Sequence, residues 1–258
     1  MVDSHMRKCA FAALLTIWMF PLLSLAEDKK NEPLKMKEGV SWSRVLKQSG
    51  LFLAIQCSVR IAYEADTRLE FRGPFFKDYF ESVRGLHGWD DGDTFPVNYL
   101  GHPWMGAVAG RIFVQNDPSG KTFDFRNNKQ YWKSRLKALG WSAVYSTTFE
   151  LSPVGEAAIG NVGGKPWPDG MAYCDLVNTP VLGTGILILE DLTDRFVVRW
   201  LERQTGFVPL TAFTRAVLNP SRSMANVMRF RWPWHRDSRP GLRVASQMRQ
   251  SKADDNKE

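Results

Sequence analysis

The chain has 258 residues, of which 44% are hydrophobic and 12% aromatic, and its formal net charge at pH 7 is +7. This length and apolar content exclude a wholly disordered protein, because such a chain can bury a sizeable core. Three cysteines are too few for a disulfide framework, and no histidine pair has the spacing of metal ligands. The sequence therefore predicts no cofactor and no metal site, and no motif in it names a reaction.

Residues 6–26 have the pattern of a secretory signal peptide. Arg7 and Lys8 open a short basic region, an apolar run follows, and the run ends with small residues at Ser24 and Ala26. Signal peptidase requires small side chains at these two positions, so cleavage is expected after Ala26. The pattern places the mature protein in the periplasm or in association with the outer membrane.

A second interpretation of the same segment is an uncleaved membrane anchor. Its apolar core, Cys9 to Leu25, is at the short end of the roughly 17–25 residues that cross a bilayer. Residues 1–5 precede a more natural start at Met6 and are interpreted as a cloning remnant or a misassigned start. They are excluded from the prediction of the fold.

The rest of the chain predicts a mostly α-helical protein with one helical-bundle-like domain over residues 42–228. Residues 27–41 are charged and aperiodic and are expected to form a flexible linker. Loops rich in glycine are expected at 85–96 and 160–170. Apolar periodicity predicts helices over 42–64, 71–84, 97–114, 131–151, 175–201 and 207–218, and another after residue 219.

Two local patterns predict how these helices begin and pack. Gly106 and Gly110 put a small-residue face on the third helix, which favours close packing against another helix over a ligand-binding surface. His102 and Pro103 mark the start of this helix, since proline suits the first turn. In the last helix, Asn219 is expected to act as the N-cap and Pro220 to occupy the first turn.

Residues 229–258 are interpreted as a basic, disordered tail. Arginines combined with two tryptophans are typical of a segment that contacts an anionic membrane surface, although a simply solvated tail is the alternative. Nucleic acid is not expected as a partner of an exported protein. The residues expected to make the membrane contact are Arg229, Arg231, Trp232, Trp234 and Arg236.

Two cysteines, Cys57 and Cys174, remain after cleavage of the signal peptide. An oxidising compartment permits a disulfide between them. Cys57 lies in an apolar helical stretch, however, and a buried free thiol is equally ordinary there. The sequence leaves both alternatives open, as it does the oligomeric state.

Four short motifs in a fixed order connect the chain with a known family. They are NYLGHP at residues 98–103, FELSPVGE at 149–156, DLVNTPVLG at 175–183 and NPSRSMAN at 219–226. With these motifs the chain resembles the exported bacterial proteins grouped as domain of unknown function 3943, over roughly residues 89–229. The resemblance implies a secreted or envelope protein of Gram-negative type. It implies no established activity and supplies no catalytic residues.

Polar residues interrupt the apolar helices, and His102, Glu150 and Asp175 are the candidate site residues among them. Charged groups are seldom fully buried without a partner, so one reading is a structural network in which His102 bonds a carboxylate. A second reading makes His102 a general base or metal ligand oriented by Glu150 or Asp175. A third makes His102 and Asp175 helix caps.

The sequence leads to two functional hypotheses. The first is a non-enzymatic, exported cell-envelope protein that contacts membrane lipid or an envelope partner. The second is a hydrolase that acts on an envelope lipid or glycan through His102 and nearby carboxylates. The site separates them, because an open pocket around these residues favours the enzyme and a sealed core favours the structural protein.

Overall fold

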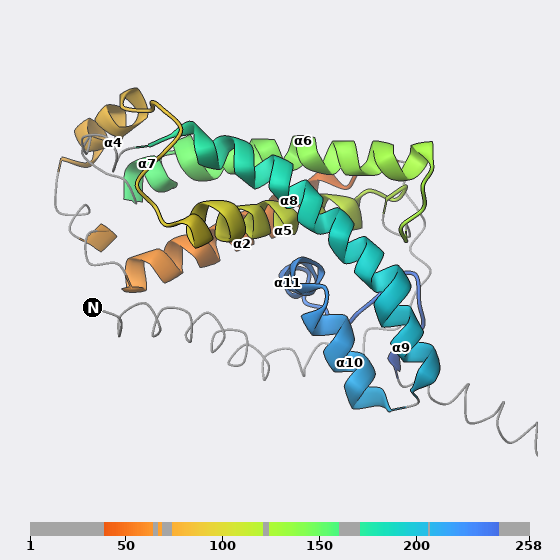
Figure 1. The fold of residues 1–258 in the computed structure, drawn as a ribbon. Coiled ribbons are helices and arrows are strands. Elements are labelled where there is room, and N and C mark those ends of the chain that lie inside the picture. Colours follow the sequence, from red (N-terminus) through yellow and green to blue (C-terminus); the bar gives the residue numbers. More distant parts are fainter. Residues whose placement is uncertain are drawn as a thin grey trace, which may run out of the picture.

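In the computed structural model of this protein, every regular element of the described residues is a helix, and these helices pack into one domain (Figure 1). The prediction of a mostly α-helical single domain is confirmed. The signal peptide, most of the linker and the loop at 160–170 lie outside the described residues. The structure describes residues 39–63, 67–68, 74–120, 124–159, 171–205 and 207–242.

The helices lie close to where the apolar periodicity places them. In chain order they are α2 (Trp42–Tyr63), α4 (Phe75–Arg84), η2 (Val97–Gly101), α5 (His102–Asn116), α6 (Lys129–Leu151), α7 (Glu156–Ile159), α8 (Tyr173–Thr193), η3 (Asp194–Val198), α9 (Arg199–Gln204), α10 (Val208–Val217) and α11 (Pro220–Met228). The segments η2 and η3 are π-helical turns, which periodicity does not reveal. Through η3 the helix α8 runs on into α9.

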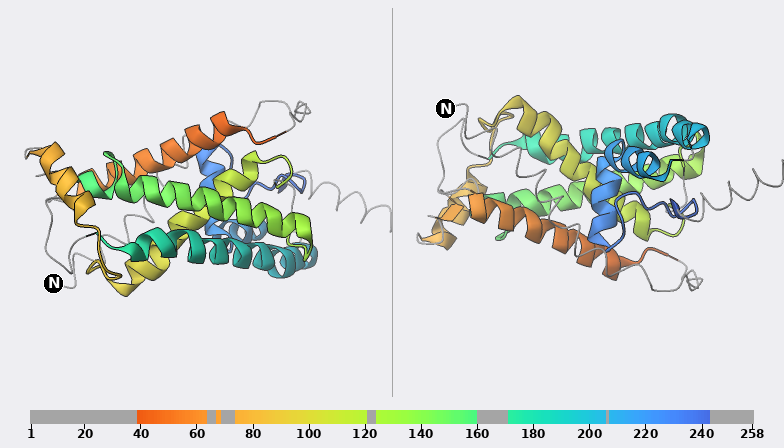
Figure 2. Two further views of the ribbon diagram at one scale, coloured as in Figure 1. Left: turned by 90° about the horizontal axis from the view of Figure 1, so that it is seen from above. Right: turned by 90° about the horizontal axis from the view of Figure 1, so that it is seen from below.

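Three helices, α5, α6 and α8, form the centre of the domain. Nearly every residue of α5 is buried, because α6 and α8 pack against it along its length. Helix α6 covers this centre from above, and α11 lies below it against α5 and α2 (Figures 1 and 2). An apolar cluster that includes Phe52, Ile112 and Met228 joins α2, α5 and α11.

The backbones of α5 and α8 touch at a glycine on each helix. A Cβ atom added to Gly106 would lie 1.8 Å from the carbonyl oxygen of Thr179, and one added to Gly183 would lie 2.7 Å from that of Pro103. A Cβ on Gly110 would lie 3.2 Å from the Cδ1 atom of Leu187 and 3.5 Å from the Cβ atom of Ala138, which is a looser fit. The small-residue face predicted on α5 is therefore a helix-packing surface, and Gly106 makes the close approach possible.

Contacts in this crossing fix the directions of the three helices. Gly106 lies at Thr179 and Gly110 lies at Leu187, so residue numbers rise together along α5 and α8. On α6 they run in the opposite sense, since Ser142 donates a hydrogen bond to the Gly106 carbonyl at 3.0 Å while the earlier Ala138 lies at Gly110. The end of α6 thus meets the beginnings of α5 and α8.

A buried carboxylate, and not Asn219, caps α11. Glu190 accepts hydrogen bonds from the backbone N–H of Ser221 at 2.8 Å, from its hydroxyl at 2.7 Å and from the N–H of Arg222 at 3.3 Å. Asn219 stands at the predicted N-cap position and Pro220 in the first turn, but the Asn219 side chain makes no capping bond. A carboxylate outcompetes an amide here because negative charge is favoured at a helix N-terminus.

Residues 229–242, the first part of the segment predicted to be a disordered tail, pack on the helices, and residues 243–258 lie outside the described residues. Arg236 is buried, and its guanidinium donates to Asp194 at 3.1 Å and to the backbone carbonyl of Arg215 at 2.7 Å. Arg239 donates to both carboxylate oxygens of Glu202, at 2.8 and 2.9 Å. The basic residues are held here because buried carboxylates need partners.

Because the contact at Gly106 is so close, a single methyl group added there should destabilise the protein. Gly106→Ala places that methyl against backbone of α8, which cannot rotate away, and should lower the free energy of unfolding by about 1–3 kcal/mol. Gly185→Ala is the matched control, since nothing lies within 4 Å of its Cβ position. Alanine there should stabilise the helix by up to about 1 kcal/mol. Chemical denaturation of both variants measures this, and equal effects would contradict the packing account.

Candidate functional site

The structure brings His102, Glu150 and Asp175 together in one buried cluster. The Nδ1 atom of His102 lies 3.5 Å from Oε1 of Glu150, and its Nε2 atom lies 3.6 Å from Oδ2 of Asp175. The three residues are only 5–7% exposed. The sequence offered Glu150 and Asp175 as alternative partners of His102, and the structure places both of them beside it.

Helix directions explain why three distant residues meet. His102 begins α5, Asp175 lies in the first turn of α8, and Glu150 lies in the last turn of the antiparallel α6. The Ser146 hydroxyl donates to the backbone carbonyl of Asp175 at 3.1 Å and fixes α6 against α8 at this level. Each central helix therefore contributes one side chain to what we call the histidine cluster, His102, Glu150 and Asp175.

The capping interpretation of His102 and Asp175 is wrong. The N-cap positions are Gly101 for α5 and Ala172 for α8, and neither helix start has a side-chain cap. His102 follows directly on the π-helical turn η2, so the chain is already helical before it. Both side chains instead point into the interface between the helices.

Two further polar residues extend the cluster toward η2. The amide of Asn98 donates to Asp91 at 2.7 Å, and one carboxylate oxygen of Asp91 lies within 4.8 Å of ligand atoms of Cys174 and Asp175. Cys174 and Cys57 are both free thiols. The sequence drew no attention to Asp91, because it is one of several acidic residues in a loop and nothing in their spacing marks which is buried.

Burial shifts the protonation of the whole cluster toward neutral forms. Burial lowers the pKa of His102 to about 4, with Arg60 adding to this shift and Asp91 opposing it. Burial also raises the pKa of Glu150 to about 8. Asp175 has a pKa of about 9, raised by burial first and then by its hydrogen bond with Asp91 and the charge of Glu150. A neutral imidazole thus lies between two protonated carboxyls at pH 7.

Several polar atoms of the cluster are buried without a partner. Within the described part of the chain, Nδ1 of His102, Oε1 of Glu150 and Oδ1 of Asp175 have no hydrogen bond. The oxygen Oδ1 of Asn98 and the hydroxyl of Thr179 are in the same condition. An unmade hydrogen bond in a core costs about 1–3 kcal/mol, so such a concentration is unusual for a merely structural core.

The histidine cluster is closed to solvent, since each of its three side chains is buried. The pockets around Arg222 and around Phe125 are lined by other residues. As it stands, the cluster can hold protons or a small ion.

A second polar centre lies at the other end of the three central helices, around Asp191. Its carboxylate is fully buried and accepts hydrogen bonds from Arg111 at 2.9 Å, Arg135 at 2.8 Å, Arg222 at 2.7 Å and the Tyr131 hydroxyl at 2.9 Å. Burial opposes ionisation, but the three guanidinium groups outweigh it and lower the pKa of Asp191 to about 2. We call this set the arginine centre.

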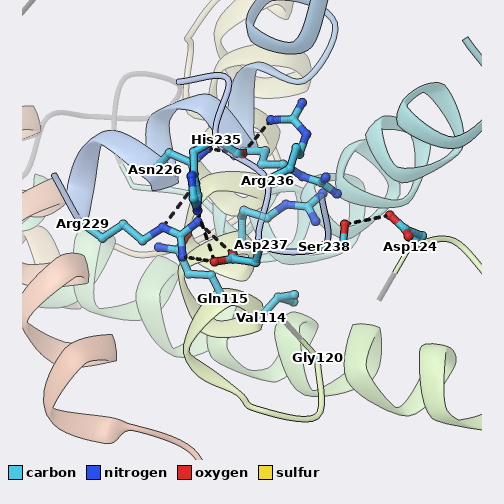
Figure 3. A pocket seen from close by; sticks show the side chains of 12 residues that line it. Val114, Gln115, Gly120, Asp124, Asn226, Arg229, His235, Arg236, Asp237 and Ser238 are labelled. Atoms are coloured by element: carbon cyan, nitrogen blue, oxygen red, sulfur yellow. Dashed lines mark hydrogen bonds and ion pairs between the residues drawn. The ribbon is translucent and has the colours of Figure 1, made fainter. Parts of the chain in front are cut away.

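The segment 229–242 closes the arginine centre from outside. Figure 3 shows Arg229 bonded to Asp237, and Arg236 reaching past it into the domain. The pocket between them has a volume of only about 30 Å³, room for a single water. The sequence does not show that Asp191, Asp194 and Glu202 are buried, since acidic residues on a helix are ordinarily solvated.

Comparison of the chain with family models, with curated proteins and with solved structures gives no match.

The shifted carboxyls predict a stability that falls as pH rises. Folded Glu150 and Asp175 hold protons to higher pH than the unfolded chain, so their contribution is complete below about pH 4 and is lost toward pH 8–9. His102 has the opposite sign and destabilises the fold between about pH 6.5 and 4. Melting temperatures in chelator, which removes competing divalent ions, should therefore decline from pH 6.5 to pH 9.

Glu150→Gln isolates the carboxyl part of this pH dependence. Glutamine cannot ionise, so the variant should lose part of the alkaline decline and gain stability relative to the wild type at pH 8.5 more than at pH 6. Parallel melting curves of the two proteins across this range would contradict a buried, protonated Glu150.

Proposed function

We propose that this protein is an exported, non-enzymatic cell-envelope protein that lies on a membrane surface. The observation that carries the proposal is an apolar stripe on the outer side of the continuous helix from α8 to α9. Its residues are more than a third exposed: Val181, Leu182, Leu189, Phe196 and Trp200. None of the helices in the described ranges has a stretch both long and apolar enough to cross a bilayer.

The stripe has the composition of a helix that lies in a membrane interface. Leu182, Leu189 and Phe196 are seven residues apart, which keeps them on one side of the helix. The stripe extends for about 30 Å at 1.5 Å per residue. Apolar surface of this extent is uncommon on a monomer and marks an interaction site.

Basic side chains accompany the stripe. The guanidinium of Arg195 lies over the ring of Phe196, 5.3 Å from its centroid, and Arg203 is exposed one helical turn beyond Arg199. Trp200 is 52% exposed between them. An apolar row with tryptophan and arginine beside it suits acyl chains below and phosphate head groups around the helix.

The second half of the proposal, absence of catalysis, is supported by the sealed histidine cluster. A hydrolase needs its base within reach of a bound substrate, and His102 is 7% exposed and lines neither the pocket around Arg222 nor that around Phe125. Export rests on the signal-peptide pattern at 6–26, and membership of domain of unknown function 3943 on the four sequence motifs. Both belong to the proposal.

Helix α10 offers a smaller surface of the same kind. Leu210, Phe213 and Val217 fall at helical spacing and are 40–62% exposed. Of the tail residues expected to touch lipid, Arg229 and Arg236 are instead bonded to Asp237 and Asp194. Arg231 is exposed and Trp232 and Trp234 are partly exposed, so the proposal keeps these three as a further contact with an anionic surface.

Binding to lipid vesicles tests the proposal. The mature protein should bind vesicles that contain anionic phospholipid, and Leu189→Asp or Phe196→Asp should weaken binding by about tenfold or more. Burial of either side chain is worth about 1.5–3 kcal/mol, and 1.4 kcal/mol corresponds to tenfold. Phe76→Asp on α4, 71% exposed in the wild type, is the control and should leave binding unchanged.

Two results would contradict the membrane assignment. One is equal loss of binding in all three variants, which would mean general hydrophobicity and not the stripe. The other is a protein that forms dimers through the stripe and ignores vesicles, detected by light scattering of the wild type and of Leu189→Asp.

A further inference from the structure

We propose that the histidine cluster is a binding site for one divalent transition-metal ion, held by His102, Glu150 and Asp175. One nitrogen or oxygen atom from each of these residues lies within 4.8 Å of the other two. The proposal is independent of the membrane contact, because no residue of the apolar stripe takes part.

The first support is the combination of burial and unmade bonds. His102 Nδ1, Glu150 Oε1 and Asp175 Oδ1 are sealed from solvent, and none has a partner among the described residues. The three side chains do not form good hydrogen bonds with one another. The imidazole nitrogens lie 3.5 Å from Oε1 of Glu150 and 3.6 Å from Oδ2 of Asp175, which is too long. A cation satisfies all three atoms at once.

The second support is spacing. Ligands bound to zinc at about 2.0–2.1 Å in a tetrahedron lie about 3.4 Å from one another. The distance from Nδ1 of His102 to Oε1 of Glu150 is 3.5 Å, and the three-residue set spans no more than 4.8 Å. Small side-chain movements therefore suffice to bring all three onto one ion.

The third support is charge. Two carboxylates and a neutral imidazole balance a divalent cation, so the loaded site is neutral and suits a buried position. In the arginine centre, the negative charge of buried Asp191 is instead balanced by three guanidinium groups that bond to it. His102 lies beside both Glu150 and Asp175, and the arginine whose charge acts on Glu150, Arg60, forms an ion pair with Glu156.

The donor set selects the class of ion. Imidazole favours zinc and iron, and carboxylate oxygen accepts these and manganese. Calcium takes six to eight oxygen ligands and magnesium keeps several waters, which a closed site with a nitrogen donor does not offer. Sequence spacing gave no sign of the site because each ligand comes from a different helix.

Zinc binding to the full mature chain, purified without a histidine tag, tests the proposal. After treatment with chelator, one equivalent of Zn²⁺ is added and unbound ion is removed by gel filtration. Elemental analysis should find about one zinc per chain, and Co²⁺ substitution should give visible absorption bands. Zn²⁺ should raise the melting temperature of the wild type, whereas Mg²⁺ and Ca²⁺ should not.

Isosteric variants locate the ion. Glu150→Gln and Asp175→Asn keep side-chain shape and should each weaken zinc binding more than about 100-fold, beyond the 10–100-fold effect of residues outside the ligand set. Glu202→Gln removes a buried charge that pairs with Arg215 and Arg239, away from the histidine cluster, and should retain zinc. Absence of stoichiometric zinc from the folded wild type, equal stabilisation by Ca²⁺, or unchanged binding in both cluster variants would overturn the proposal.

Discussion

The contact between the backbones of α5 and α8 governs the arrangement of the rest of the domain. Gly106 lies against the carbonyl of Thr179 and Gly183 against that of Pro103, so these two helices approach as closely as helices can. That contact sets the register of α5 and α8. The antiparallel α6 is fixed at the same level, because the Ser142 hydroxyl donates a hydrogen bond to the Gly106 carbonyl. As a consequence, polar residues at both ends of α5 face acidic residues on α8, and both polar centres follow from one crossing.

The two centres meet the cost of buried charge differently. At one end, Asp191 is surrounded by Arg111, Arg135 and Arg222, and its ionised form is stabilised. Breaking such a buried set typically costs about 3–5 kcal/mol. Arg236 and Arg239 of the segment 229–242 neutralise two further buried carboxylates, Asp194 and Glu202. At the other end, Glu150 and Asp175 keep protons and leave polar atoms without partners. The unpartnered atoms and the close spacing of His102, Glu150 and Asp175 are the physical basis of the metal site that we propose.

Sequence reasoning succeeded where local pattern controls the structure. The helix over 42–63, the proline start of α11 and the small-residue face at Gly106 all follow from periodicity or backbone chemistry, and His102, Glu150 and Asp175 were singled out as polar residues within apolar helices. It failed where distant groups compete. Nothing local indicates that Glu190 replaces Asn219 as a cap, or that acids buried in η3 and α9 capture Arg236 and Arg239. Burial of Asp91 is likewise a tertiary effect.

The central claim is that a metal ion does at the histidine cluster what arginines do at Asp191. Crystals of the protein purified from the cell envelope, with diffraction measured above and below the absorption edges of zinc, iron and manganese, test it directly. The account predicts one anomalous peak between α5, α6 and α8, within bonding distance of His102, Glu150 and Asp175. An ordered cluster without an anomalous peak, with these side chains bonded to water or to one another, would contradict it.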